Sequence, residues 1–236
     1  MSKELLSRVG DWSKVLGPLF DDPRFEETRK SISIQSLSHK VYPEKADVFK
    51  AFELCQMKDL KVVILGQDPY HNGSATGVAF GVKEGDRIPP SLRIIYKELC
   101  DQFDHTPEEF DYSLQHWGKQ GVLLLNTALT VNAKQAGSHS VFWRWWTKEV
   151  IKGICEHKRH TIFVLWGKHA QSYKENIPIA VLQAAHPAAE AYSGGSGGFY
   201  GNGHFLNINE RISPKINWFE LPKKLTDQEQ IDLYNE

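Results

Sequence analysis

The stretch KVVIL, residues 61–65, is the first of four short apolar runs that decide the fold of this 236-residue chain. The others are GVLLL (121–125), TIFVLW (161–166) and IAVLQA (179–184). All four are rich in β-branched or large apolar residues and lack a polar alternation, which is typical of strands buried on both faces. We therefore expect four strands that share one sheet.

Helical stretches separate these runs. SLRIIYKELCDQF (91–103) follows the first run, WRWWTKEVIKGICEH (143–157) follows the second, and the shorter KHAQSYKENI joins the third to the fourth. The first sixty residues are typical of amphipathic helices that begin at Pro and Asp residues. Alternation of strands and helices predicts an α/β fold with three layers, α/β/α, around a central four-stranded, mainly parallel sheet. We expect a single domain spanning residues 1–236.

Composition narrows the function classes. The formal net charge of -1 argues against a protein that wraps DNA, so any nucleic-acid site must be local. The amino terminus resembles neither a signal nor a transit peptide, and no apolar run reaches membrane-spanning length, so we expect no membrane partner. We expect a cytoplasmic protein, or a nuclear one in a eukaryote. The three widely spaced cysteines predict buried apolar residues rather than disulfides or metal ligands.

A polar segment follows each apolar run. These segments are GQDPYH after the first run, Asn126 after the second, GKHAQ after the third and AHP after the fourth. In open α/β sheets, ligands bind beyond the carboxyl ends of the strands. The sequence therefore predicts one site, assembled from Asp68, Tyr70, Asn126, Lys168 and His186.

The residue types in this site favour one kind of chemistry. The chain has no nucleophile elbow, no GxxxxGK phosphate loop and no metal-ligand spacing among its histidines. A carboxylate with a hydrogen-bond donor suits a reaction whose transition state has a cationic sugar and an anionic leaving group. An Asn amide offers a donor and an acceptor side by side, which suits reading the edge of a base.

Several motifs together resemble the family 1 uracil-DNA glycosylases. They are GQDPYH (66–71), GVAF (77–80), IPPSLRIIYKEL (88–99), GVLLLNTALTV (121–131), FVLWGKHAQ (163–171) and AAHP (184–187). The resemblance covers nearly the whole chain. It implies a monomeric DNA-repair enzyme without a cofactor, which flips uracil out of single- or double-stranded DNA and hydrolyses its N-glycosidic bond, leaving an abasic site. It also implies inhibition by small acidic proteins that mimic DNA.

The resemblance assigns roles to five residues of the site. Asp68 would align the hydrolytic water and stabilise the oxocarbenium-like sugar. His186, as a neutral imidazole, would donate a hydrogen bond to O2 of the departing uracil anion. Asn126 would read the uracil edge and reject cytosine, and Tyr70 would close the space that the methyl group of thymine needs. Phe80 would stack on the uracil ring.

Further matches concern the handling of substrate and DNA. Gln67 would help to hold the uracil site through its backbone. Lys168 stands where the family has a serine, and as a point charge it can meet the same phosphate. His139 matches a DNA-side histidine of the family, with an ordinary surface histidine as the alternative. The predicted DNA contacts are His71, Pro89, Pro90, Ser91, His139, Lys168, Pro187, Ala188, Ala189 and Glu190.

The loop after His186 departs from the family pattern. The family has HPSPLSAYRGFFG, whereas this chain has HPAAEAYSGGSGGFYG at 186–201. Ala188 replaces a phosphate-gripping serine, and Glu190 stands at or beside the leucine that enters the duplex. One hypothesis is a base-extrusion loop without its wedge, with Glu190 near the phosphates and a bias toward single-stranded or mispaired uracil. The alternative is that the glycine-rich loop brings Phe199 or Tyr200 into the gap.

Two other functions remain as alternatives. The first is a DNA-binding or replication accessory protein on which catalysis is incidental, and the intact Asp68, Asn126 and His186 argue against it. The second is a glycosylase that acts on another lesion, but Tyr70 and Asn126 favour uracil as the base. The tryptophan-rich run at 143–146 is predicted to pack within a helix rather than to stack on bases.

Overall fold

The computed structural model describes residues 2–220. Its central sheet has four parallel strands in the order β3-β2-β5-β6. Their bounds are β2 (Val62–Gly66), β3 (Val122–Asn126), β5 (Ile162–Trp166) and β6 (Val181–Ala184). The predicted four-stranded parallel sheet is therefore confirmed, and each strand lies within or one residue from the run that predicted it.

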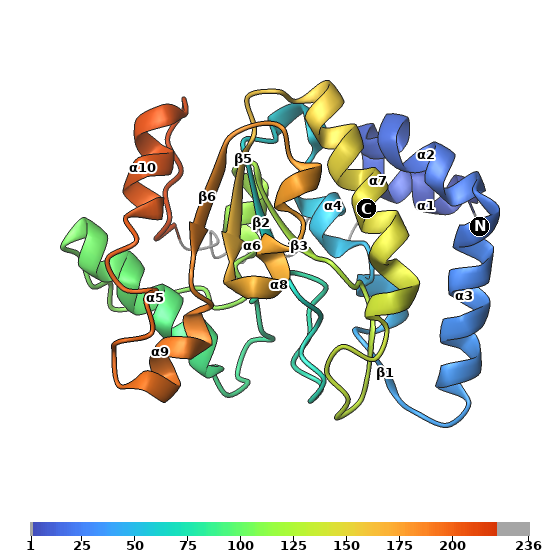
Figure 1. Cartoon of the computed structure of the whole chain (residues 1–236), viewed down its shortest axis with the longest axis horizontal. Coiled ribbons are helices and arrows are strands. Elements are labelled where there is room, and N and C mark those ends of the chain that lie inside the picture. Colours follow the sequence, from blue (N-terminus) through green and yellow to red (C-terminus); the bar gives the residue numbers. More distant parts are fainter. Residues whose placement is uncertain (1, 221–236) are drawn as a thin grey trace, which may run out of the picture.

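Helices cover both faces of this sheet (Figure 1). Side chains alternate between the faces, so Val63 and Leu65 of β2 pack into one apolar cluster and Val62 and Ile64 into the other. The first cluster is closed by α1 (Ser2–Val9), α2 (Ser13–Asp21), α3 (Pro23–Ser36), α4 (Lys50–Leu54) and α7 (Ser140–His157). The second is closed by α5 (Pro90–Phe103), α6 (Gln115–Lys119) and α10 (His204–Arg211). The predicted three-layer α/β/α arrangement is confirmed.

Burial of the strands agrees with the prediction except at one edge. Every residue of β2, β3 and β5 is buried, as the continuous apolar runs predict. The same prediction is wrong for β6, where Gln183 is exposed and the other three residues are only half-buried. β3 and β6 are both edge strands, but α4 and α6 pack against β3, whereas fewer elements cover β6.

Smaller elements connect these layers. β1 (Val41–Tyr42) and β4 (Val131–Asn132) form a separate antiparallel pair, and α8 (Gly167–Gln171) and α9 (Pro187–Ser193) follow β5 and β6. Short 3₁₀ helices span Gly10–Trp12, Lys45–Asp47, Met57–Asp59 and Lys174–Asn176. Within residues 2–220, no helix is both long and apolar enough to span a membrane.

Two predictions about buried residues are also confirmed. The three cysteines are free and buried. Trp143 and Trp146 are buried in the cluster under α7, and Trp145 is partly buried with its Nε1 donating to Thr28 Oγ1 at 3.0 Å. The tryptophan-rich run therefore packs within the protein.

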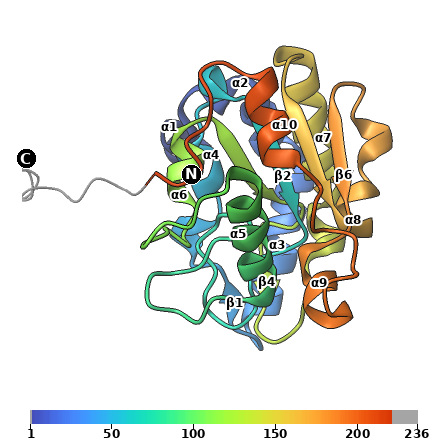
Figure 2. The ribbon, with the colours of Figure 1, turned by 90° about the vertical axis from the view of Figure 1, so that its left-hand side faces the viewer.

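The register of the sheet brings the carboxyl ends of the strands to one edge. Gly66 lies opposite Asn126, and Trp166 lies opposite Ala184. Figure 2 shows α5, α9 and α10 on the side that faces the viewer, with α9 below α10. The segments after β2, β3, β5 and β6 consequently meet at one place.

Candidate active site

Asp68 lies in the turn directly after β2. This turn is tied to the one after β3, because the N–H of Thr127 donates to the carbonyl of Gly66 at 3.0 Å and that of Ala128 to Gln67 at 2.9 Å. The carboxylate of Asp68 accepts the N–H of Gly137 at 2.5 Å through Oδ2. Burial raises the pKa of Asp68 above its usual value, and the Gly137 hydrogen bond opposes that rise. The site thus holds a half-buried carboxylate in a fixed orientation.

Asn126 ends β3 beside this turn, with only 6 % of its surface exposed. Its position requires a glycine on the neighbouring strand. A Cβ at Gly66 would lie 2.3 Å from Asn126 Oδ1, closer than any side chain could tolerate. Gly66 therefore makes room for the amide at the carboxyl edge of the sheet.

An aromatic wall forms the next side of the site. The hydroxyl of Tyr70 donates to the carbonyl of Phe80 at 3.2 Å and lies 3.2 Å from Ser91 Oγ. Phe80 has a φ of 65°, in the left-handed region that a bulky residue rarely adopts. Its ring centre lies 5.6 Å from that of Trp166 and 6.3 Å from that of His186. Backbone strain of this kind collects at functional sites, where the surrounding structure holds it in place.

His186 follows β6 and caps the first turn of α9. Its Nδ1 accepts the N–H of Ala188 at 3.1 Å, so the neutral imidazole carries its proton on Nε2. Burial lowers the pKa of His186, although the residue remains accessible to solvent, and this favours the neutral form. Gly167, with a φ of 86°, permits the close approach, because a Cβ there would lie 2.7 Å from His186 Cβ. The result is an oriented neutral N–H donor.

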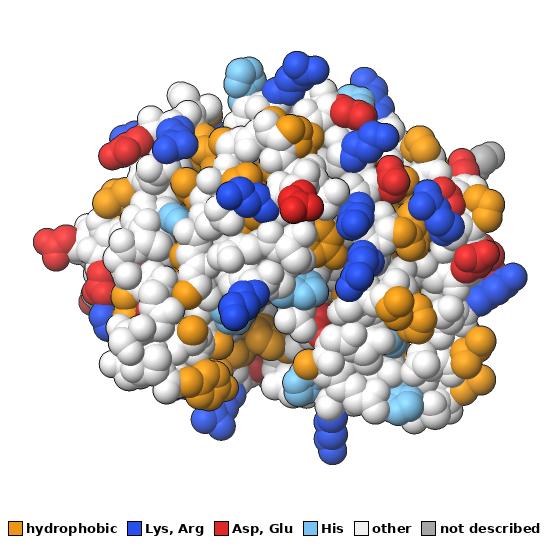
Figure 3. Space-filling view, in the orientation of Figure 1, with side chains coloured by type: hydrophobic (Ala, Val, Ile, Leu, Met, Phe, Trp, Pro, Cys, Tyr) orange, Lys and Arg blue, Asp and Glu red, His pale blue; other side chains and the backbone are white. Residues whose placement is uncertain are grey.

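The predicted site residues therefore meet at one edge of the sheet. Figure 3 shows the surface hollowed at the lower side of the molecule, with hydrophobic, acidic and histidine side chains around the hollow. A carboxylate, an Nε2–H donor, an amide and an aromatic ring suit the cleavage of a sugar–base bond. In the part of the chain that the structure describes, no group of three His, Cys, Asp or Glu side chains could hold a metal ion.

Comparison of the chain with known proteins shows which family it belongs to. A model of the Uracil DNA glycosylase superfamily matches residues 52–211. The chain belongs to this superfamily. It is 40% identical over 216 residues to a uracil-DNA glycosylase of Amoebophilus asiaticus, covering 88% of this chain and 96% of the relative. It is 42% identical over 218 residues to that of Neisseria meningitidis serogroup A, covering 88% and 98%.

Solved structures agree with this family. The crystal structure of the mimivirus UNG Y322L in complex with UGI has a TM-score of 0.81 and 25% sequence identity, covering 94% of this chain and 91% of that one. The mimivirus uracil-DNA glycosylase alone has a TM-score of 0.78 and covers 88% and 86% of the two chains. The three-layer fold of this glycosylase is therefore shared by solved members of the family.

The prediction that His139 contacts DNA is wrong. Its side chain is fully buried, with Nδ1 2.8 Å from Thr130 Oγ1 and Nε2 2.9 Å from Asn132 Oδ1. Burial lowers the pKa of His139 to about 4, so the ring is neutral. A side chain enclosed in this way holds the strand β4 in place and cannot reach DNA.

The prediction for Glu190 is also wrong. Only 3 % of its surface is exposed, and its carboxylate accepts the N–H groups of Gly197 at 2.8 Å, Phe199 at 2.5 Å and Tyr200 at 3.0 Å. Burial alone would raise the pKa of Glu190, but these backbone hydrogen bonds outweigh it and the pKa is lowered. Glu190 therefore folds the glycine-rich segment against α9 and does not face the phosphates.

The residues that the sequence offered as a replacement wedge lie elsewhere. Phe199 is fully buried, with its ring centre 5.2 Å from that of Trp166, so it cannot enter a duplex. Tyr200 is half-buried under Lys97, whose Nζ lies 4.9 Å from its ring centre. Tyr192 on α9 is instead 85 % exposed. Its only signal in the sequence is a large aromatic side chain among the small residues of AAEAYS.

The other predicted DNA residues differ in their access to solvent. His71, Pro90 and Lys168 are exposed, and Gln67, next to Asp68 in the turn after β2, is exposed as well. Pro89, Ala188 and Ala189 are half-buried, whereas Ser91 and Pro187 are buried. Ser91 is in contact with the Tyr70 hydroxyl, so it belongs to the wall of the site as well as to the start of α5.

Proposed function

We infer that this chain is a uracil-DNA glycosylase, which hydrolyses the N-glycosidic bond of deoxyuridine in DNA and releases free uracil. The observation that carries this inference is the meeting of Asp68, Asn126 and His186 at the carboxyl ends of three strands. The family and the relatives named above point to the same reaction. An accessory protein without catalysis would not need an oriented carboxylate and an oriented N–H donor at the same edge of the sheet.

Asp68 acts on the sugar side of the bond. Gly137 holds Oδ2, which leaves Oδ1 to align the attacking water and both oxygens to stabilise the positive charge that develops on the sugar. The group serves as a carboxylate, since only the ionised form carries the charge and accepts from water. Because its pKa is raised, protonation in acid removes the activity earlier than for an ordinary aspartate.

His186 acts on the leaving group. With Nδ1 held by the N–H of Ala188, the Nε2–H points away from α9 and donates to uracil O2 as negative charge builds there. The depressed pKa keeps the ring neutral at physiological pH. A neutral donor stabilises the uracil anion without transferring its proton, which suits a leaving group that is itself a weak base.

Three side chains select uracil. Asn126 forms hydrogen bonds through its amide with the edge of uracil. Cytosine has an amino group at that edge, so its donor would face the N–H donor of the Asn126 amide. Tyr70, tethered by its hydroxyl, fills the space where thymine carries its methyl group. Phe80 stacks on the ring, supported by Trp166. Gln67 adds its backbone, which is tied to the turn after β3.

The DNA backbone is held around this site. We propose that His71 and Lys168, which are exposed, and the Pro89-Pro90-Ser91 turn bind phosphates next to the flipped nucleotide, while Pro187, Ala188 and Ala189 border the strand. We also propose that the enzyme works as a monomer in the cytoplasm. UGI, which the mimivirus UNG binds in the comparison structure, should cover the same edge of this chain.

The experiment that tests this function is uracil release from an oligonucleotide, single-stranded and paired with A or G. The wild-type chain should release uracil from at least one of these, and Asp68→Asn should lower the rate constant about 10²–10⁴-fold while DNA binding persists. No release from any substrate would favour the accessory-protein alternative. Asn126→Asp should gain cytosine release, and a variant without that gain would contradict the role of Asn126.

A further inference from the structure

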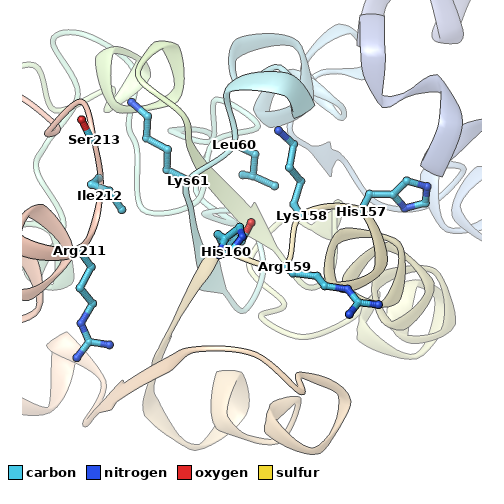
Figure 4. A pocket seen from close by; sticks show the side chains of 10 residues that line it. Leu60, Lys61, His157, Lys158, Arg159, His160, Arg211, Ile212 and Ser213 are labelled. Carbon is cyan, nitrogen blue, oxygen red and sulfur yellow. The ribbon is translucent and has the colours of Figure 1, made fainter.

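Two recesses on the surface have Lys and Arg side chains in their lining. The larger, about 320 Å³, lies at the amino-terminal ends of β2 and β5, opposite the active site. Figure 4 shows Lys61 and Lys158 pointing upward, Arg159 to the lower right and Arg211 downward, so the four charged ends do not come together. Its two lysines already donate to backbone carbonyls, at 3.0 Å and 2.6 Å. This recess does not converge on a ligand.

The smaller recess, about 240 Å³, is of a different kind. It lies between α7 and α8 and is called the α7–α8 recess below. Figure 3 shows Lys and Arg side chains over these helices, above the hollow at the lower side of the molecule. The residues that line it are Arg144, Lys148, His169, Ser172 and Tyr173.

His169 connects this recess to the catalytic turn. Thr127 Oγ1 donates to the carbonyl of Gln67 at 2.8 Å, so at 2.7 Å it accepts from Nε2–H of His169. Burial lowers the pKa of His169, the charge of Asp68 raises it and the charge of Arg144 lowers it further. One imidazole therefore lies within electrostatic reach of both the catalytic carboxylate and the recess.

The recess carries uncompensated positive charge. Arg144 and Lys148 are exposed and lie four residues apart on α7, where like charges repel and destabilise a helix. Across residues 2–220, neither of them forms an ion pair, and no acidic side chain lines the recess. An anion would relieve this repulsion, and a polyanion is what the neighbouring active site has to bind.

We propose that the α7–α8 recess binds phosphodiester groups of the DNA strand beyond those next to the flipped uridine. This inference rests on the proposed function. The guanidinium of Arg144 can bind a phosphate with two parallel hydrogen bonds, and Lys148 adds a point charge. Exposed Lys168 is in the first turn of α8, which follows β5 directly and precedes Ser172 and Tyr173 of the recess, so it adds a third cation on this short helix. The local charge also explains how a chain of net charge -1 binds DNA.

Contacts with phosphates have a characteristic salt dependence. Each phosphate that a cation neutralises adds about 0.9 to the slope of log Kd against log salt in duplex DNA and about 0.7 in single strands. Two such contacts should therefore contribute a slope of about 1.4–1.8, which between 1 M and 0.1 M salt is about 25- to 60-fold in Kd. The effect is independent of base sequence.

The test is the double variant Arg144→Gln/Lys148→Gln, matched with Arg159→Gln/Arg211→Gln from the larger recess. Kd is measured for an undamaged duplex of about 20 base pairs over a salt series, and KM and kcat for uracil release. The first variant should lower the salt slope by about 1–2 and raise KM about 10-fold or more at 0.1 M salt, with kcat unchanged. The second variant should behave as wild type.

Each outcome decides the question. A wild-type slope in the first variant, or an equal loss in both variants, would overturn the recess as a DNA site. Arg144→Lys/Lys148→Arg, which keeps both charges, should restore the slope, and thermal melting checks that every variant is folded. If the wild-type chain released no uracil, the proposed function would fail while the Kd series still decided the recess.

Discussion

Replacing Tyr192 by alanine should separate the action of the enzyme on duplex DNA from its action on single strands. Tyr192 is 85 % exposed on α9, so its removal breaks no packing and should change stability by no more than about 0.5 kcal/mol. When uridine leaves a duplex, the gap can be filled by an aromatic ring, and base–aromatic stacking is worth about 1–3 kcal/mol. That energy corresponds to about 5- to 150-fold in kcat/KM on a duplex.

The assay compares kcat/KM for one uracil-containing strand, alone and annealed to its complement. Tyr192→Ala should lower the duplex value within that range and leave the single-strand value within about 2-fold, because single strands have no gap to fill. Tyr192→Leu should keep most duplex activity. Leu206→Ala, which removes an exposed apolar side chain from α10, serves as the control. Equal losses on both substrates, or no loss on the duplex, would refute the reasoning.

Three further predictions concern the groups that hold the site. Because burial raises the pKa of Asp68, the folded state binds a proton more readily than the unfolded state, and Asp68→Asn should raise the melting temperature at pH 7 while abolishing the acid limb of the rate profile. Glu190→Ala should accelerate amide hydrogen exchange at Gly197 and Phe199, where Glu190→Gln keeps part of the protection. Gly167→Ala should displace His186 and lower kcat about 10-fold or more, which single-turnover release measures.

The fold could be predicted from the sequence because its strands are buried on both faces. A strand such as β2 needs apolar residues at every position, so a continuous apolar run in the sequence predicts it. The helices between the runs then predict that the strands pair in parallel. The register then carries every polar residue after a strand to one edge, which is why Asp68, Asn126 and His186 were found together. The run that forms β6 is also mostly apolar, but it includes Gln183, and burial at an edge depends on which elements cover the strand.

The errors at the site have a common physical origin. His139 and Glu190 are ionisable side chains, which a sequence pattern alone places on the surface because no partner for them is visible in it. Each is buried because distant polar groups satisfy it: two side chains of the β4 segment for His139, and three loop amides for Glu190. Such partners are fixed by tertiary structure and have no signature in the local pattern. The position of Arg144 in the α7–α8 recess likewise depends on how α7 packs, and the local sequence pattern does not indicate it.

The glycine-rich run after α9 needs its glycines for two reasons: Gly197 packs closely against the helix, and Gly194, Gly195 and Gly198 have positive φ. A Cβ at Gly197 would lie 2.7 Å from the backbone nitrogen of Glu190, so only glycine lets this segment fold back on the helix. A second buried carboxylate, Glu98 of α5, accepts the N–H of Gly201 at 2.8 Å. Two carboxylates thus fix a segment whose glycines would otherwise cost conformational entropy on folding. With the segment fixed, α9 keeps Tyr192 exposed to solvent, and the Tyr192→Ala comparison tests whether an aromatic ring there acts in place of the leucine that is missing at position 190.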